Sequence, residues 1–382
     1  MFKNRKTLVR GILAMIGTTI GAGIFGVPAM MEKSGILAGS IIFWIVAGVM
    51  LVTQLLFVEV IAHVKDRHRF PGYVGQIIGL WARRIGVVTL TAGLIGAIFA
   101  YIILGGEFLW LIASGLGFNT SLLVWQLLFW AFGSFIVTLA LGKVAKIESR
   151  LTWVLIALIA LMVALAIPKA QTQLFVIQHW STSFAVLGVF VFALFGASVI
   201  PEVFDITRRR IDWTRRAVFV GSFVSALLTW LFGVFVYAAI SNGPTTELSS
   251  MTLIFHSAFW WILPAVGFLA VVTSYIMSAF DLQIMYRFDL NQKKYVGLLI
   301  ALVFPLLLLF IAPRNFIVTL ETVGSFFTTT NALLIVVAAY LVMRREKKGK
   351  KKNFWWRNVA PTVAAALFVI TIIQHAYELI TH

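Results

Sequence analysis

Long apolar segments alternate with short basic loops along this whole chain, and that alternation restricts its fold more than any single motif does. A helix needs about 20 mostly apolar residues to cross a bilayer, and the sequence contains eleven such windows. Their approximate limits are 10–31, 36–63, 85–113, 122–141, 152–168, 184–204, 217–241, 258–286, 295–312, 315–342 and 356–378. With 61% hydrophobic and 12% charged residues, the chain cannot hide its apolar surface in a water-soluble core. We therefore predict an all-α integral membrane protein, with residues 1–382 forming a single transmembrane domain.

The positions of the basic residues support this division into spans. If successive loops alternate sides and the N-terminus lies inside, 28 of the 31 Lys and Arg residues fall on the inner side. Lys33, Lys169 and Arg314 remain outside. This is the positive-inside pattern, and it predicts a multi-pass protein of a cell (cytoplasmic) membrane with a cytoplasmic N-terminus and an external C-terminus. The net charge of +17 then reflects topology, so no nucleic acid partner is expected.

The first apolar window contains a cluster of residues that weaken a helix. "GTTIGAGIFG" (17–26) holds four glycines and two adjacent threonines, which have poor helix propensity and compete for backbone partners. Unpaired backbone inside a membrane persists only where it is buried in protein or lines a cavity. The pattern is consistent with an unwound segment that binds a ligand, but the small residues at Gly17 and Gly21 are equally consistent with close helix packing.

The sixth window repeats the pattern and favours unwinding. "GASVIP" (196–201) again places small residues in mid-span with a proline one turn later, as "GAGIFGVP" does in the first window. The two interruptions lie in the first and sixth windows and are offset by five spans, an odd number, so the second set would run inverted through the membrane. We predict two inverted five-helix repeats, about 10–168 and about 184–342, with helices 1 and 6 broken. The window at about 356–378 is an extra, eleventh span.

Several motifs resemble those of the amino acid/polyamine/organocation superfamily. "GTTIGAGIFGVP" (17–28) resembles the first helix of its aromatic and hydroxy amino acid permeases and of the related amino acid/auxin permeases. "AYIILGGE" (100–107), "FALFGASVIPE" (192–202) and "VTSYIMSAFD" (272–281) resemble their third, sixth and eighth helices. The resemblance implies a leucine-transporter-type fold and a substrate site between helices 1, 3, 6 and 8.

The same resemblance implies roles for individual residues. Amides of Ala22 and Gly23 would bind a substrate carboxylate, which Tyr101 would cap. Oxygens of the two breaks would bind the substrate ammonium, namely those of Thr18, Thr19, Phe192, Ala193 and Phe195. With Leu194 added, the pocket wall is apolar and aromatic, and no carboxylate adjoins the break. We therefore expect a neutral amino acid substrate, aromatic or branched.

Acidic residues within the predicted spans are candidates for ion coupling, because charges at membrane depth are costly. Glu107 and Glu202 are our proton-carrying or gating candidates, whereas Glu59 and Asp281 lie near predicted inner ends, where solvation is expected. A sodium site is the rival. In sodium-coupled proteins of this fold it would use the carbonyls of Gly17 and Ile20 and the hydroxyls of Thr273 and Ser274. The resemblance favours protons slightly.

These observations predict a secondary active transporter that imports amino acids by ion symport. An uncoupled facilitator or exchanger, or a non-transporting amino acid sensor on the same fold, remain alternatives. An enzyme is not expected, because the sequence contains no G-x-S-x-G, H-E-x-x-H or P-loop element. No cofactor is expected besides the coupling H⁺ or Na⁺, and the absence of cysteine excludes thiolate metal sites. The segment 69–84 is predicted to be one interfacial helix.

Overall fold

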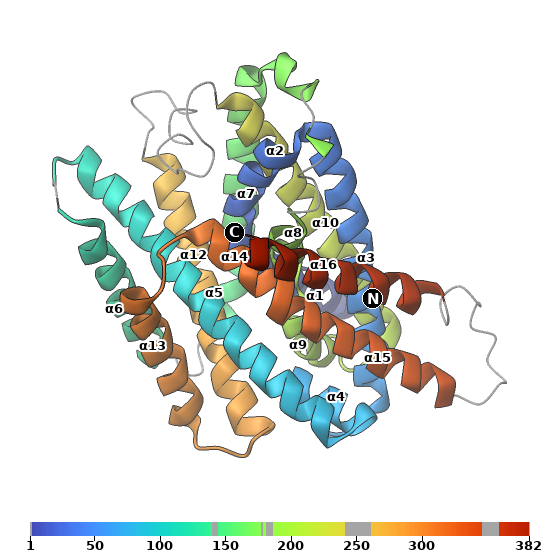
Figure 1. Ribbon diagram of the computed structural model, residues 1–382. Helices are drawn as coiled ribbons and strands as arrows, with labels where there is room; N and C mark the ends of the chain where they lie inside the picture. Colours follow the sequence, from blue (N-terminus) through green and yellow to red (C-terminus); the bar gives the residue numbers. More distant parts are fainter. Residues whose placement is uncertain are drawn as a thin grey trace.

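The computed structural model describes residues 2–118, 120–139, 144–176, 179–180, 186–240, 261–345 and 359–381. Every regular element in these ranges is a helix (Figure 1). The ends of the predicted windows 122–141, 184–204, 217–241, 258–286 and 356–378 fall partly outside the described residues.

The described helices account for the apolar windows of the sequence. Nine of them are long and apolar enough to cross a membrane, or ten if one bent pair counts as a single span. The first half of the chain contains α1 (Phe2–Thr19), η1 (Ala22–Gly26), α2 (Val27–Ser34), α3 (Ile36–His63), α4 (Phe70–Ile78), α5 (Leu80–Gly115), α6 (Leu122–Leu139), α7 (Val144–Ala166), η2 (Ile167–Lys169) and η3 (Thr172–Phe175). The second half contains α8 (Leu187–Ala193), η5 (Ala197–Val199), α9 (Ile200–Ile206), α10 (Ile211–Ala239), α12 (Ile262–Phe288), α13 (Lys294–Ile311), α14 (Phe316–Thr322), η7 (Val323–Thr328), α15 (Thr329–Arg345) and α16 (Ala360–Thr381). The protein is therefore a multi-pass membrane protein.

Two spans leave regular helix in their middle. α1 ends at Thr19, and the chain continues through η1 into α2 with a bend of 46° between the two halves. The other span is helical as α8, irregular at Phe195 and Gly196, and helical again from η5 into α9. Each half that follows an interruption has a proline in its first turn, Pro28 in α2 and Pro201 in α9. Proline suits that position because its missing N–H would have no partner in a first helical turn.

One sequence prediction about a helix boundary is wrong. Residues 69–84 do not form a single interfacial helix, because Gly79 separates α4 from α5. Its φ is +131°, a backbone conformation that favours glycine and cannot continue an α-helix. α5 therefore begins at Leu80 and runs for 36 residues, and the short α4 packs beside it.

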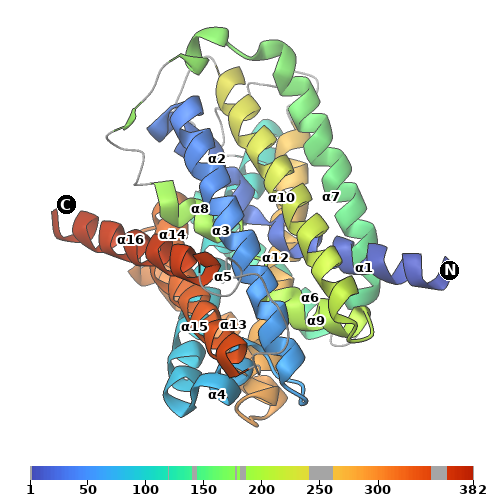
Figure 2. The same ribbon diagram turned by 90° about the vertical axis from the view of Figure 1, so that its right-hand side faces the viewer.

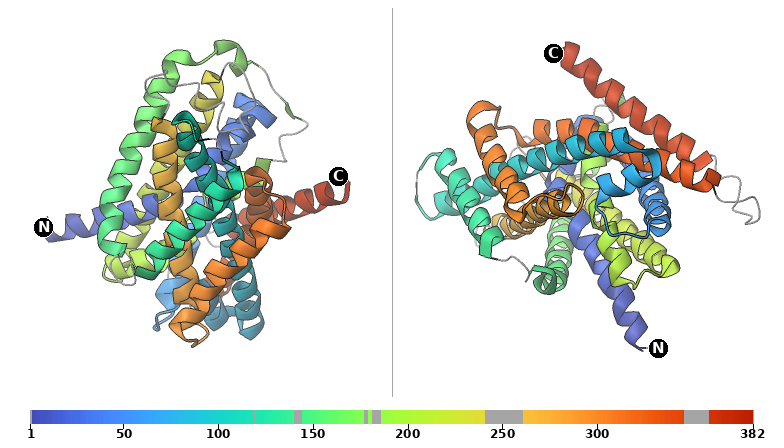
Figure 3. Two further views of the ribbon diagram at one scale, coloured as in Figure 1. Left: turned by 90° about the vertical axis from the view of Figure 1, so that its left-hand side faces the viewer. Right: turned by 90° about the horizontal axis from the view of Figure 1, so that it is seen from below.

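The packing of the long helices surrounds the two interrupted spans. α10 lies against α1, α2 and α3, and α12 lies against α5 and α13. The π-helix η7 packs beside α8, and α16 covers α15 and part of α3. Figures 2 and 3 show that the N-terminal end of α1 and the C-terminal end of α16 project from opposite flanks of this bundle. The interrupted spans thus lie inside, where their irregular backbone is shielded from lipid.

Candidate functional site

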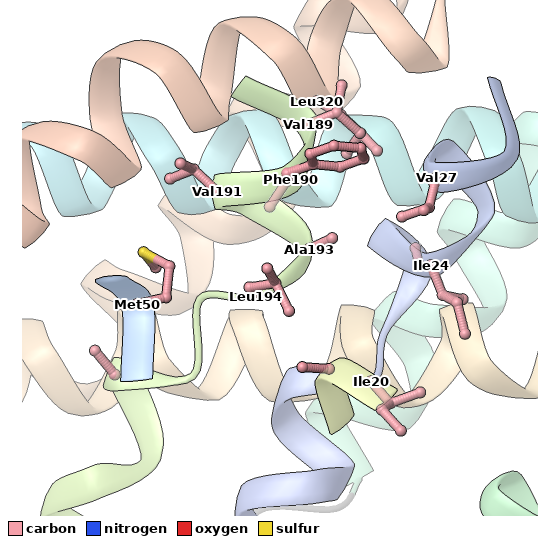
Figure 4. Packing of buried hydrophobic residues seen from close by; sticks show 14 of the residues in the cluster. Ile20, Ile24, Val27, Met50, Val189, Phe190, Val191, Ala193, Leu194 and Leu320 are labelled. Carbon is pink, nitrogen blue, oxygen red and sulfur yellow. The ribbon is translucent and has the colours of Figure 1, made fainter. Parts of the chain in front are cut away.

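The two interruptions lie against each other in the core. A Cβ added to Gly23 would lie 2.9 Å from the Cα of Ala193, so only a glycine permits this approach. Figure 4 shows the ribbon at Ala193 and Leu194 beside the extended stretch that joins Ile20 to Ile24. Two irregular backbone segments from distant parts of the sequence therefore meet at one place.

A cavity of about 90 Å³ opens beside these segments, and we call it the central cavity. Four parts of the chain line it, namely the first break, α5, the second break and α12. The lining residues are Gly17, Thr18, Thr19, Gly21, Gly23, Leu90, Gly93, Leu94, Ala97, Tyr101, Phe192, Ala193, Phe195, Ser198, Ser274, Met277, Ser278 and Asp281. The lining includes the aromatic residues Tyr101, Phe192 and Phe195, several hydroxyls and one carboxylate. This combination can hold a molecule that has both an apolar ring and charged polar ends.

Two buried hydroxyls of residues that line this cavity have no hydrogen-bond partner in the described part of the chain. The side-chain oxygens of Thr18 and Thr19 make no hydrogen bond to any described residue, although both residues line the cavity. An unpaired buried hydroxyl costs free energy, so native proteins usually pair such groups with protein, water or ligand. These two hydroxyls are therefore suited to bind a polar group of a ligand.

The backbone near the first break also departs from helical pairing. The amide of Gly21 donates to the Thr19 carbonyl at 3.1 Å, and the amide of Ile24 donates to the Gly21 carbonyl at 3.3 Å. These contacts replace the regular pattern in which each amide bonds four residues back. Helix-end amides and carbonyls exposed in this way can bind anionic and cationic groups.

The second break is held by a residue that the sequence analysis did not identify. Gln54 of α3 is buried and donates from Nε2 to the Leu194 carbonyl at 2.9 Å. Its own Oε1 accepts from the Ser222 hydroxyl of α10. Gln54 thus satisfies a carbonyl that the end of α8 leaves without a helical partner. A glutamine in the middle of a predicted apolar span was the sequence feature that could have identified this residue.

Most of the predicted substrate-site residues line the central cavity. Those that do are Thr18, Thr19, Gly23, Tyr101, Phe192, Ala193 and Phe195. Ala22 and Leu194 are buried in the core beside it and are not among the lining residues. The hydroxyl of Tyr101 is hydrogen-bonded to Ser278 of α12, which joins α5 to α12 across the cavity.

The predicted sodium ligands are only partly assembled. Gly17 and Ser274 line the central cavity, whereas Ile20 and Thr273 do not. Both hydroxyls donate to the same carbonyl of their own helix, Thr273 to Ala270 at 2.8 Å and Ser274 to Ala270 at 3.0 Å. Their lone pairs remain available, but their orientation is explained by the helix alone.

The predicted acidic coupling residues occupy different places. Glu107 is half-buried on α5, does not line the cavity, and forms no hydrogen bond or ion pair with any described residue. Glu202 of α9 lies 2.5 Å from Nη2 of Arg69. Glu59 is buried and paired with Arg215.

Asp281 differs most from the sequence-based expectation. We expected it to be solvated near a membrane surface, yet it lines the central cavity and its side chain is only 17% exposed. Its Oδ1 lies 3.6 Å from Nη1 of Arg69, and its side chain is hydrogen-bonded to Ser198. The sequence analysis counted Arg69 only as a loop charge. The contact links residues from distant loops and helices, so sequence spacing could not reveal it.

Comparison with known proteins places this arrangement in a family. Residues 4–377 match the model of the tryptophan/tyrosine permease family. A solved structure of Mhp1, a nucleobase-cation-symport-1 family transporter in a closed conformation with bromovinylhydantoin bound, has a similar fold. That likeness has a TM-score of 0.68 at 15% identity, and it covers 96% of this chain and 91% of the Mhp1 chain. No curated protein matches the sequence significantly.

The family match covers nearly the whole chain and agrees with the resemblance of its first-helix motif to aromatic amino acid permeases. The fold of the Mhp1 transporter covers the same length. The protein is therefore a membrane transporter and not an enzyme, and it belongs to the tryptophan/tyrosine permease family.

Proposed function

We propose that the protein imports neutral aromatic amino acids across a cytoplasmic membrane by ion symport, with the proton as the coupling ion. The observation that carries this proposal is the central cavity. It is lined by Thr18 and Thr19, whose hydroxyls have no partner among the described residues, and by an aromatic wall formed by Tyr101, Phe192 and Phe195. The family description, tryptophan/tyrosine permease, supports the same substrate class.

A bound aromatic amino acid would use both kinds of surface. Its carboxylate would approach the amides at the start of η1, near Ala22 and Gly23, where the helix dipole favours an anion. Its ammonium would approach Thr18, Thr19 and the carbonyls of the second break. Its ring would pack against the aromatic wall, where ring pairs add about 0.5 to 1.5 kcal/mol beyond area burial.

The transport cycle we propose uses two inverted five-helix repeats, with α16 as an appended eleventh span. The interrupted spans would move relative to α5 and α12 and expose the central cavity to each side in turn. The N-terminus would be cytoplasmic and the C-terminus external, as the distribution of Lys and Arg favours.

The proton is preferred to sodium because carboxylates lie near the cavity, whereas the candidate sodium ligands are incomplete. Ile20 and Thr273 are not among the residues that line the central cavity. Glu107 and Glu202 remain our sequence-based candidates for proton movement.

Uptake into proteoliposomes tests the proposal. The purified full chain would be offered radiolabelled tryptophan, tyrosine, phenylalanine, leucine and lysine, under an inward proton gradient or an inward sodium gradient. We expect accumulation of the aromatic amino acids under the proton gradient and none of lysine. Binding without accumulation under either gradient would favour a facilitator, an exchanger or a sensor, and accumulation under sodium alone would reverse the choice of ion.

A further inference from the structure

An ion-paired network lies at one end of the central cavity. Arg69, which precedes α4, is buried, with a side chain 9% exposed. Its Nη2 lies 2.5 Å from Oε1 of Glu202, its Nη1 lies 3.6 Å from Oδ1 of Asp281, and Nη1 donates to the Ser198 carbonyl at 3.4 Å. One guanidinium thus joins a loop, the second interrupted span and α12.

This network separates two cavities. Asp281 and Ser198 line the central cavity, whereas Arg69 and Glu202 line a second cavity of about 160 Å³. The two sets of lining residues have no member in common. The contact between Arg69 and Asp281 therefore crosses the partition between the cavities.

α12 passes from one cavity to the other along a single face. Met277 lines the central cavity, Asp281 contacts Arg69, and Ile284 lines the second cavity. Residues at these spacings lie on the same side of a helix. Asp281 thus lies between the two cavities on this face of α12.

The backbone at Arg69 is fixed independently of its side chain. Asp289, at the end of α12, accepts from the Arg69 amide at 3.1 Å and from the Gly72 amide at 3.0 Å. His68 Nδ1 lies 3.2 Å from the same carboxylate. Loss of the Arg69–Asp281 contact would therefore separate the guanidinium from α12, while its pairing with Glu202 and the backbone of the loop stay in place.

The charges in this network do not balance. Arg69 faces Glu202, Asp281 and Asp289, and the charged groups acting on Asp281 in the described part of the chain are Arg69 and Glu202. Burial by itself lowers the pKa of Arg69, but Asp281, Glu202 and Asp289 outweigh it, so the pKa is raised and the guanidinium stays charged. Leaving His68 aside, three carboxylates surround this one guanidinium. Excess negative charge in a poorly solvated site attracts a further cation.

The geometry indicates which carboxylate would receive that cation. Glu202 has the shorter contact with Arg69, 2.5 Å against 3.6 Å for Asp281, and its side chain is 38% exposed. Asp281 has the longer contact with Arg69, and it lines the central cavity, as Thr18 and Thr19 also do. A cation arriving with the substrate would therefore meet Asp281 first.

We propose that Asp281 accepts the coupling proton from the central cavity, and that its neutralisation breaks its contact with Arg69 and opens the partition to the second cavity, while Arg69 stays paired with Glu202. The carboxylate gains one proton to become a carboxylic acid, and it returns the proton to the second cavity when the contact re-forms. This inference rests on the proposed ion-coupled transport and names the residue that performs the coupling.

The natural absence of cysteine allows a direct test of the partition. Single-cysteine proteins carrying Met277→Cys or Ile284→Cys would be placed in membrane vesicles and treated with a membrane-impermeant maleimide. The side from which Ile284→Cys reacts identifies the face of the second cavity. From that face, Ile284→Cys should react at all pH values. Because maleimide reacts with the thiolate, the rate of Met277→Cys is divided by that of Ile284→Cys at the same pH. This ratio should be about tenfold higher at acid than at alkaline pH, which corresponds to about 1.4 kcal/mol in the opening equilibrium.

Variants of Asp281 then identify the proton acceptor. In an Asp281→Asn background, this ratio should be high at both pH values, because the neutral side chain mimics the protonated acid. Asp281→Glu should restore the pH dependence. Asp212→Asn, which removes a carboxylate whose side chain is 84% exposed on α10, should behave like the parent. Unchanged labelling of Ile284→Cys in each background verifies that the variant is folded.

Two results would overturn the inference. One is a ratio of the Met277→Cys and Ile284→Cys rates that is independent of pH in the parent, and the other is a pH dependence that survives Asp281→Asn. In the second case Glu202→Gln would show whether Glu202 is the acceptor instead. This readout needs no substrate, so a failure of aromatic amino acid uptake would reject the proposed function while leaving the labelling test decisive.

Discussion

At the scale of single residues, the site is defined by which buried polar groups are paired. Gln54 satisfies the Leu194 carbonyl and is itself satisfied by Ser222. The hydroxyls of Thr18 and Thr19 are not satisfied by any described residue. The hydrogen bonds of Gln54 fix the second break, whereas the threonine hydroxyls remain available to a ligand. Pairing thus separates residues that support the cavity from residues that can bind within it.

Thr19→Val should weaken substrate binding without destabilising the protein. The valine has nearly the same shape, and the hydroxyl it replaces has no partner among the described residues. One lost hydrogen bond to ligand is worth about 0.5 to 1.5 kcal/mol, so the Kd for tryptophan should rise roughly two- to tenfold. Equilibrium binding of radiolabelled tryptophan in detergent measures this, and thermal unfolding measures stability.

Thr229→Val is the matched control for that substitution. The Thr229 hydroxyl of α10 is also buried without a partner, but the residue does not line the central cavity. We expect an equally small effect on thermal stability and an unchanged Kd. An equal loss of affinity in both variants would show that Thr19 acts through general packing.

At the scale of elements, the site exists because two interrupted spans pack at backbone distance. Their contact is permitted by glycine at position 23, which faces Ala193 and Phe192. The prolines that follow each break begin the next helical segment, so the irregular stretch remains short. The location of the cavity therefore follows from where the two interrupted spans leave regular helix. Its size depends on how closely these two spans approach each other.

Gly23→Ala should disrupt the site while leaving the protein in the membrane. The new Cβ would lie 2.9 Å from the Cα of Ala193, a backbone atom that cannot rotate away. Overpacking of this kind costs about 1 to 3 kcal/mol, and we expect tryptophan affinity to fall about tenfold or more. Binding assays on protein of verified membrane insertion would measure it.

Gly48→Ala on α3 is the control for that change, because an added Cβ there meets nothing within 4 Å. It should leave binding unchanged and stabilise the helix by up to about 1 kcal/mol. If Gly23→Ala bound tryptophan as the parent does, the break would not be the substrate site.

At the scale of the whole molecule, the long helices connect the site to both ends of the bundle. α5 spans 36 residues, from Leu80 past Tyr101 to Gly115. α12 packs along it, carries Asp281 and is followed directly by Asp289. Motion at one end can therefore reach the cavity through rigid helices whose facing side chains lie in the core.

Single cysteines should report opposite sides of the membrane at the two ends of α5. Asp66→Cys precedes α4, and Gly117→Cys follows α5. In intact cells an impermeant maleimide should label Gly117→Cys and leave Asp66→Cys unmodified until the cells are opened. The reverse pattern would invert the proposed orientation, and labelling of both in intact cells would contradict the assignment of α5 as a membrane span.

The sequence by itself determined the class of protein, the approximate positions of the apolar helices and the family resemblance. These follow from local properties, because apolar length and loop charge are read residue by residue. The sequence also indicated most of the cavity-lining residues of the two breaks, since small residues followed by proline mark a helix end wherever it packs. The inverted repeat, the orientation in the membrane and the coupling ion remain predictions.

Only the tertiary structure decided which polar residues meet. α12 is apolar around its circumference, so its sequence does not reveal that Asp281 faces the central cavity. The partner of Asp281 is Arg69, more than two hundred residues away, and Gln54 reaches Leu194 across 140 positions. Such contacts depend on the depth and rotation of each helix. In a membrane protein, this depth and rotation are set by packing against neighbouring helices. Hydropathy does not reveal them, because it does not distinguish a face against protein from a face against lipid.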